Sequence, residues 1–213
     1  MMSFFYNNNA RLELHKFIPK TSKTLLDVGC NTGEFGRVLK VDNEIEIWGV
    51  EPNPITSQVA VEYLDHVVCD LFQENIPIPD GYFDVITFND SLEHFPFPDQ
   101  ALILSKGKLK EDGVIVFSIP NVRQIDNLEH LLFEKDWCYE DSGIRDRTHL
   151  RFFTKKSIID LFNNCGYEVI SIEGINEKYW HETKYFRRIL YKLIPSWMED
   201  TKYTQFAGVA RLI

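Results

Sequence analysis

Short apolar runs alternate with segments of helical periodicity along the first half of this chain, and this alternation constrains the fold more than any other feature. The runs cover residues 24–28, 45–50, 66–69, 83–88 and 114–119. Their apolar residues are continuous, as in strands that helices bury on both faces. The segments between them predict helices over 34–40, 54–63 and 99–110. This order predicts an α/β protein built on parallel strands.

The second half predicts a different arrangement. Residues 121–151 show no clean period and are too long for a plain connection, so we expect a substrate-facing insertion. A helix is predicted to begin after Thr154, with Phe153 and Ile158 as a hydrophobic staple and Gly166 as its C-terminal stop. Two more strands are expected over 167–175 and 205–213, separated by an aromatic, basic helix over 183–193.

Length and composition limit the classes of protein. With 213 residues, 44% of them hydrophobic, the chain supports one sizeable core, so we expect a single domain over 1–213 with a helical lid or contact element near 176–200. A net charge of -9 argues against general nucleic-acid binding. No stretch is apolar enough to span a bilayer, no signal peptide is evident, and the scattered cysteines favour a cytoplasmic location.

A glycine-containing turn joins the first strand to its helix. Residues 25–36 read LLDVGCNTGEFG, with glycines at 29, 33 and 36. Glycines let the backbone turn sharply and approach a ligand, while the helix N-terminus offers unpaired N–H groups. The spacing differs from the dinucleotide-binding pattern, which makes a dehydrogenase the least favoured class.

Polar residues end the following strands. Glu51 lies about twenty residues beyond the turn, where a carboxylate can accept both hydroxyls of a ribose. Asp70 ends the third strand, within reach of an adenine amino group, and residues 83–94 bring further polar groups to the same crevice. The pattern therefore predicts a nucleoside-binding site at this edge of the sheet.

These segments resemble the class I S-adenosylmethionine-dependent methyltransferases, in particular the small-molecule subgroup related to ubiquinone-biosynthesis methyltransferases and to methyltransferases of glycan-assembly clusters. The family pattern of a D-V-G-C-G-T-G turn, an acid after the second strand, D-x-L-E-H and S-x-P-N is matched at 27–33, Glu51, 90–94 and 118–121. Asn31 replaces the middle glycine, and asparagine is the non-glycine residue that best tolerates a positive φ, so we expect the turn to survive. The resemblance implies a Rossmann-like, doubly wound, seven-stranded, mostly parallel sheet with an antiparallel last strand, in three α/β/α layers.

The resemblance also implies S-adenosyl-L-methionine as cofactor and S-adenosyl-L-homocysteine as product. Asp27 and the turn would face the methionine part, Glu51 the ribose, and Asn89 the cofactor's amino group. The full expected cofactor-binding set is Asp27, Gly29, Cys30, Asn31, Gly33, Glu51, Pro52, Asp70, Leu71, Asn89 and Ser91.

Two histidines are the candidate general bases, because a hydroxyl or ammonium acceptor must lose a proton. His94 follows the fourth strand, and its alternative role is to shape the loop or contact the cofactor. His149 lies between charged residues just before the helix at Thr154, and its alternative role is to anchor an ion-paired loop. No metal site is expected, since the sulfonium is already an activated methyl donor.

The acceptor is the least determined part of the prediction. Four arginines either bind an anionic acceptor or have a structural role: Arg123, Arg145, Arg147 and Arg151. Four aromatic residues either stack on a ring of the acceptor or belong to the core of the insertion: Trp137, Tyr139, Tyr179 and Trp180. The basic helix candidate over 184–193 is a lid, an oligomer contact or a membrane-surface element. We expect methyl transfer to an oxygen or nitrogen of a small molecule, with a sugar or glycan precursor favoured. A tRNA-modifying enzyme and a non-catalytic cofactor-binding partner subunit are the alternatives, and a homodimer remains open.

Overall fold

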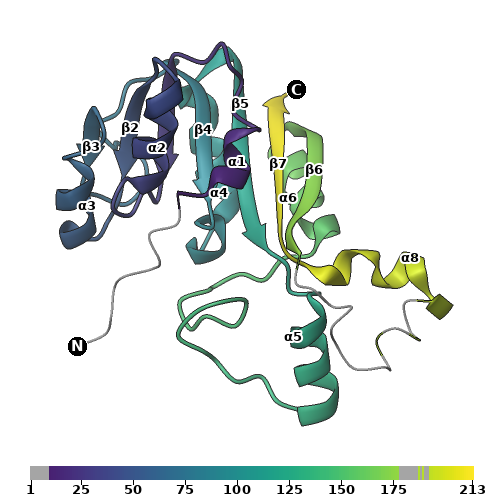
Figure 1. Ribbon diagram of the computed structural model, residues 1–213. Helices are drawn as coiled ribbons and strands as arrows, with labels where there is room; N and C mark the ends of the chain where they lie inside the picture. Colours follow the sequence, from purple (N-terminus) through teal and green to yellow (C-terminus); the bar gives the residue numbers. More distant parts are fainter. Residues whose placement is uncertain (1–9, 178–186, 188, 190–191) are drawn as a thin grey trace.

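The computed structural model describes residues 10–177, 187, 189 and 192–213 (Figure 1). Its centre is a sheet in which the strands lie in the order β3-β2-β1-β4-β5-β7-β6. The strands are β1 (Thr24–Val28), β2 (Glu46–Val50), β3 (His66–Val68), β4 (Phe83–Asn89), β5 (Leu109–Pro120), β6 (Tyr167–Glu177) and β7 (Tyr203–Leu212). β1 to β5 pair in parallel, and β7 is antiparallel to both β5 and β6. The predicted seven-stranded sheet with an antiparallel last strand is confirmed.

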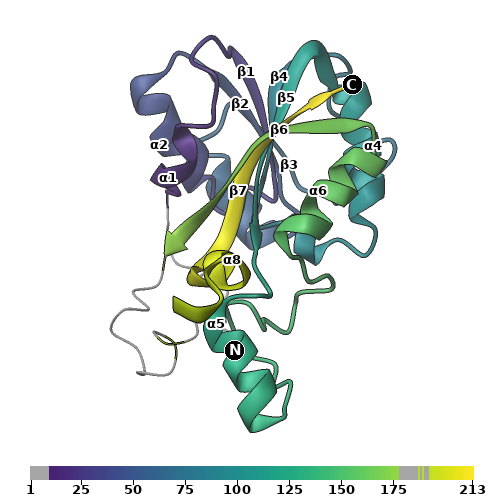
Figure 2. The same ribbon diagram turned by 90° about the vertical axis from the view of Figure 1, so that its right-hand side faces the viewer.

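Helices cover both faces of the sheet. Figure 2 shows α1 (Leu12–His15) and α2 (Glu34–Asp42) on one face, and α4 (Pro98–Lys108) and α6 (Lys155–Asn164) on the other. α3 (Pro54–Ala60) contributes Ala60 to the same apolar cluster as α2, whereas α4 and α6 pack into a second cluster beyond the sheet. The three-layer α/β/α arrangement predicted from the resemblance is therefore present.

The helix that begins after Thr154 is capped as predicted. The Thr154 hydroxyl accepts a hydrogen bond from the Ser157 backbone N–H at 3.2 Å, and the Thr154 N–H donates to the Ser157 hydroxyl at 2.9 Å. Phe153 and Ile158 are both buried, and Gly166 adopts a φ of 76° after the helix ends. Sequence signals at this boundary were sufficient because cap, staple and stop act locally.

Several predicted boundaries were wrong. β5 begins at Leu109 rather than at residue 114, because Leu109 is buried and pairs with Phe83 across a register shift in the neighbouring strand. α4 accordingly ends at Lys108, and α3 ends at Ala60 rather than at residue 63. Tertiary pairing with β4 overrides the helical pattern in the segment after Lys108.

The segment 121–151 extends from the carboxyl end of β5 (Figure 1). It contains α5 (Ile125–Glu129) and a π-helical turn, η2 (His130–Glu134), where we predicted no regular element. A parallel bridge between Asn121 and Phe153 holds its two ends together. α8 (Pro195–Met198) and η4 (Glu199–Lys202) precede β7. Most of the basic helix predicted over 183–193, together with Tyr179 and Trp180, lies outside the described residues.

Candidate cofactor and acceptor site

The turn after β1 approaches the ligand edge of the sheet with three residues at positive φ. These are Gly29 at 82°, Asn31 at 50° and Gly33 at 77°. The Gly29 and Cys30 N–H groups donate to the Val50 carbonyl at 2.8 and 3.2 Å, which ties the turn to β2. Asn31 thus adopts the conformation predicted for the glycine it replaces, and the turn is intact.

Glu51 is bound to the same turn. Its Oε2 accepts from the Asn31 N–H and its Oε1 from the Asn53 N–H, both at 2.9 Å. The side chain is largely buried, and Pro52 beside it is exposed. A carboxylate held by two backbone donors is fixed in position, with lone pairs left on both oxygens for further hydroxyl donors. This geometry fits the ribose role predicted for Glu51.

Asp27 lies at the end of β1 and is almost fully buried. Its Oδ1 accepts hydrogen bonds from the Thr87 hydroxyl at 2.7 Å and the Asn89 amide at 3.4 Å. Burial raises the pKa of the Asp27 carboxyl to about 6, and the neighbouring charge of Glu51 contributes to this increase. A cationic ligand group beside Asp27 would favour the ionised carboxylate. This is the form that can pair with the ammonium group of the expected cofactor.

Two buried polar atoms at the end of β4 have no hydrogen-bond partner among the described residues. They are Oδ1 of Asn89 and Oγ of Ser91. A Cβ added to Gly29 would lie 3.0 Å from the Ser91 Cβ, so Ser91 adjoins the glycine turn, and the Asn89 amide reaches Asp27 at the end of β1. Buried polar atoms without partners are costly, and they mark places where a ligand supplies the missing bond. The residues therefore fit a polar nucleoside cofactor.

Asp70 and Leu71 occupy the outer part of this edge. Both are exposed, and Oδ1 of Asp70 accepts the Leu71 N–H at 2.7 Å. β3 reaches the edge through the bond from the Glu51 N–H to the Val68 carbonyl at 3.1 Å. The structure does not bring the Asp70 carboxylate into contact with the inner residues, so its adenine role stays a prediction.

His94 and His149 lie next to each other, close to Glu93. Their ring centroids are 4.9 Å apart, and His149 Nε2 lies 3.9 Å from Oε1 of Glu93. Glu93 is 1% exposed, and neither of its carboxylate oxygens has a hydrogen-bond partner among the described residues. Burial raises the pKa of Glu93 to about 8 and lowers the pKa of both imidazoles.

Sequence reasoning missed Glu93. Its place between Ser91 and His94 in the matched motif was a signal, but a glutamate followed by histidine on a turn is usually solvated. Its burial depends on the returning segment: the Glu93 carbonyl accepts the N–H groups of Leu150 and Arg151 at 2.8 and 3.0 Å. Only the folded chain brings residues 150–151 to this turn.

The four arginines proposed for an anionic acceptor all have partners within the chain. Arg145 pairs with Glu140 at 2.5 Å and Arg147 with Asp141 at 2.6 Å. Arg151 donates to backbone carbonyls of Leu150 and Pro96. This favours the structural role, and an anionic acceptor stays a prediction.

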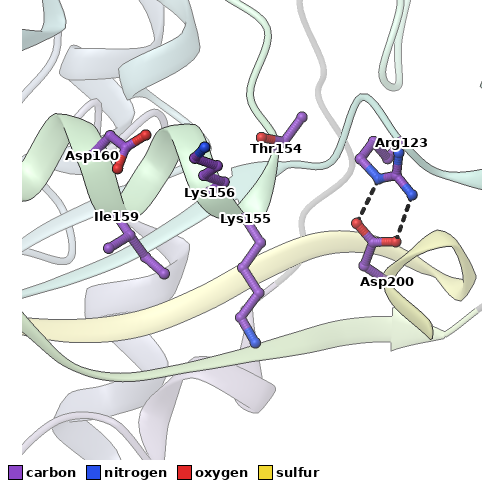
Figure 3. A pocket seen from close by; sticks show the side chains of 7 residues that line it. All are labelled: Arg123, Thr154, Lys155, Lys156, Ile159, Asp160 and Asp200. Carbon is purple, nitrogen blue, oxygen red and sulfur yellow. Dashed lines mark hydrogen bonds and ion pairs between the residues drawn. The ribbon is translucent and has the colours of Figure 1, made fainter. Parts of the chain in front are cut away.

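A pocket of about 510 Å³ includes Arg123 among its lining residues (Figure 3). It is lined by the start of α6 and by Arg123, whose Nε and Nη2 donate to the Asp200 carboxylate at 2.7 and 3.2 Å. None of the predicted cofactor or catalytic residues lines it.

Comparisons with known proteins identify the family of the chain. A family model described as "Methyltransferase domain" matches residues 5–172. The ubiquinone biosynthesis O-methyltransferase of Vibrio atlanticus is 26% identical over 183 residues, which are 78% of this chain and 73% of that protein. The enzyme of the same description from Pasteurella multocida is 30% identical over 116 residues, which are 47% of this chain and 48% of that protein. A solved S-adenosylmethionine-dependent methyltransferase from Archaeoglobus fulgidus has a TM-score of 0.71 at 21% identity, over 93% of this chain and 90% of that one. The chain therefore belongs to the methyltransferase-domain family, within the class I S-adenosylmethionine-dependent methyltransferases.

Proposed function

We propose that the protein transfers the methyl group of S-adenosylmethionine to an oxygen or nitrogen of a small-molecule acceptor. The observation that carries this is the pair of orphaned buried atoms, Asn89 Oδ1 and Ser91 Oγ, between the glycine turn and the Glu93 turn. Bound there, the cofactor supplies an activated methyl group and leaves as S-adenosylhomocysteine. The residues of the chain hold it, orient the acceptor in line and exclude water.

The geometry supports the roles that we assign to Glu51, Asp27 and Asn89, and the adenine role rests on the resemblance. We assign ribose binding to Glu51 and the amino group to Asp27 and Asn89, with Asp70 and Leu71 toward the adenine. His149 Nδ1 lies 3.1 Å from the Ile144 carbonyl, and His94 Nδ1 lies 3.1 Å from the Thr148 carbonyl. If both Nδ1 atoms carry the proton, each Nε2 has a lone pair that can act on the acceptor's proton.

We further propose a hydroxyl-bearing acceptor, with a sugar or glycan precursor retained from the sequence prediction. The relatives from Vibrio and Pasteurella are named as O-methyltransferases of ubiquinone biosynthesis, and we therefore add an oxygen of a ubiquinone precursor as a second acceptor class. A net charge of -9 counts against tRNA. The segment 121–151 would close the acceptor side. We propose a cytoplasmic location, which is consistent with four free cysteines. Among the described residues, no helix is long and apolar enough to cross a membrane.

The test uses methyl-labelled S-adenosylmethionine with sugar nucleotides, catechols and tRNA in separate reactions. We expect label in a sugar or catechol, with formation of S-adenosylhomocysteine that depends on the acceptor. Label in tRNA would replace the proposal by the nucleic-acid alternative. Tight cofactor binding with no transfer to any acceptor, including a small-molecule extract, would support the non-catalytic alternative.

A further inference from the structure

A buried carboxylate and two imidazoles converge beside the proposed cofactor site. One ligand atom from each of Glu93, His94 and His149 lies within 4.8 Å of the other two. Glu93 and His149 are buried, and His94 is half-buried. No other group of three such side chains meets this criterion in the described part of the chain.

Both histidines are oriented as metal-binding histidines are. Nδ1 of His149 contacts the Ile144 carbonyl and Nδ1 of His94 contacts the Thr148 carbonyl, each at 3.1 Å. A carbonyl oxygen can only accept, so Nδ1 carries the proton in each ring and Nε2 presents its lone pair. Metal-bound histidines typically donate their other ring N–H to a backbone carbonyl or carboxylate in this way.

The Glu93 carboxylate lacks the hydrogen bonds, among the described residues, that would offset the cost of burying it. Among the described residues, both carboxylate oxygens are without a hydrogen-bond partner, and His149 Nε2 is 3.9 Å from Oε1. A lone pair that faces an ionised carboxylate is repulsive unless a proton or a metal cation lies between the two groups. A buried carboxylate is expected to be paired or to bind a metal.

The backbone holds the three ligands on two connected segments. Glu93 and His94 lie on η1 (Leu92–His94), and the Glu93 carbonyl accepts the N–H groups of Leu150 and Arg151, directly after His149. Ligand atoms around one cation at about 2.1 Å lie roughly 3.4 Å apart, so small side-chain rotations would bring these together.

We propose that Glu93, His94 and His149 bind a divalent transition-metal cation beside the acceptor. Two imidazoles and one carboxylate suit zinc, iron(II) or cobalt(II) and leave coordination positions open. The inference deepens the proposed function and rests on it for the acceptor. An acceptor hydroxyl on the cation would lose its proton to solvent more readily, in place of direct transfer to His149. As the C–O bond forms, the C–S bond breaks and sulfur keeps the electron pair.

Cobalt(II) is the probe, because its visible absorption reports nitrogen and oxygen ligands directly. We expect untagged wild-type protein to bind one equivalent, with zinc competing. Glu93→Gln, His94→Asn and His149→Asn should each weaken binding at least about tenfold. The control is His66→Asn, because His66 is an exposed residue of β3 outside the cluster. This variant should bind cobalt(II) with the affinity of the wild type.

Absence of stoichiometric cobalt binding to the wild type would overturn the proposal, whether or not the variants fold. Unchanged binding in all three variants, with circular dichroism showing that they fold, would also overturn it. Calorimetry with S-adenosylhomocysteine, performed separately on the wild type, distinguishes failure of the metal site from failure of the proposed function. If the wild type binds S-adenosylhomocysteine but not cobalt, only the metal site is wrong. If it does not bind S-adenosylhomocysteine, the proposed function is wrong.

Discussion

Single residues at the carboxyl edge of the sheet determine what can bind there, because each has a partner or lacks one for a definite physical reason. Glu51 is held by two backbone N–H groups, Asp27 is buried against Thr87, and Asn89 has an orphaned oxygen. The first two leave acceptor capacity for a ligand, and the third requires a donor. Substitutions at these positions therefore test ligand binding more directly than they test stability.

Glu51→Ala should weaken binding of S-adenosylhomocysteine strongly. Losing one hydrogen bond to a charged group corresponds to roughly ten- to hundredfold in affinity, and the two ribose hydroxyls offer two such bonds. Isothermal titration calorimetry measures the effect. Glu62→Ala is the matched control, because Glu62 is exposed beyond α3 and should leave affinity unchanged. Wild-type affinity in Glu51→Ala would remove the ribose assignment.

Cofactor affinity should fall at acid pH because of Asp27. Its pKa is about 6 in the folded protein, above the ordinary value of 3.8, so between these values the native state keeps a proton that the unfolded chain has lost. The Asp27 contribution to unfolding free energy is therefore most favourable below the ordinary value and decreases as pH rises toward 6. Binding a cationic amino group requires the ionised form, which costs roughly a factor of ten in affinity per pH unit below the folded pKa.

Calorimetric titrations of S-adenosylhomocysteine between about pH 5 and pH 8 measure this slope. Asp27→Asn should bind more weakly at neutral pH and show a flatter profile over the acid part of the range. An identical slope in wild type and variant would assign the pH dependence to another group.

At the scale of elements, the turn after β1 is fixed by sterics. Gly29→Ala should lower the free energy of unfolding by about 1–3 kcal/mol, because it places a side chain at a φ of 82° and a Cβ 3.0 Å from the Ser91 Cβ. Gly107→Ala should change the free energy of unfolding in the opposite direction. Gly107 lies in α4 with open space where a Cβ would lie, and alanine there should add about 0.5–1 kcal/mol. Urea denaturation compares both with wild type, and equal effects of the two substitutions would contradict the assigned strain.

Elements governed by local chemistry were predictable from the sequence, and elements set by tertiary pairing were not. The Thr154 cap, the Gly166 stop and the positive φ of Asn31 follow from side-chain and backbone preferences. The start of β5 at Leu109 depends on Phe83, which lies far back in the chain. The burial of Glu93 depends on residues 150–151, and no periodicity reports such a contact. The inner residues of the candidate site were therefore named from the sequence, whereas the buried carboxylate of Glu93 beside His149 was not.

At the scale of the whole molecule, the proposed cofactor edge is formed by the sheet and its connecting turns, and the segment 121–151 extends from the carboxyl end of β5. The Asn121–Phe153 bridge brings the ends of this segment together, and the Val122 N–H also donates to the Phe153 carbonyl at 2.9 Å. A short connection can therefore replace the segment without separating β5 from α6.

Replacing residues 124–150 with a short Gly-Ser loop should leave the sheet folded and cofactor binding within a few-fold of wild type. Methyl transfer should fall by at least about a hundredfold, because His149 and the acceptor side are removed. Circular dichroism, calorimetry and the labelled-methyl assay report the three properties separately. Loss of cofactor binding in a folded variant would show that the segment belongs to the cofactor site instead.

The most direct test of the proposed cofactor site is a crystal structure of the protein with S-adenosylhomocysteine. We predict the ribose hydroxyls on the Glu51 carboxylate, the amino group near Asp27 and Asn89, and the sulfur directed toward the turn that carries Ser91 and Glu93. The adenosine bound elsewhere, or the sulfur directed away from that turn, would contradict the central claim.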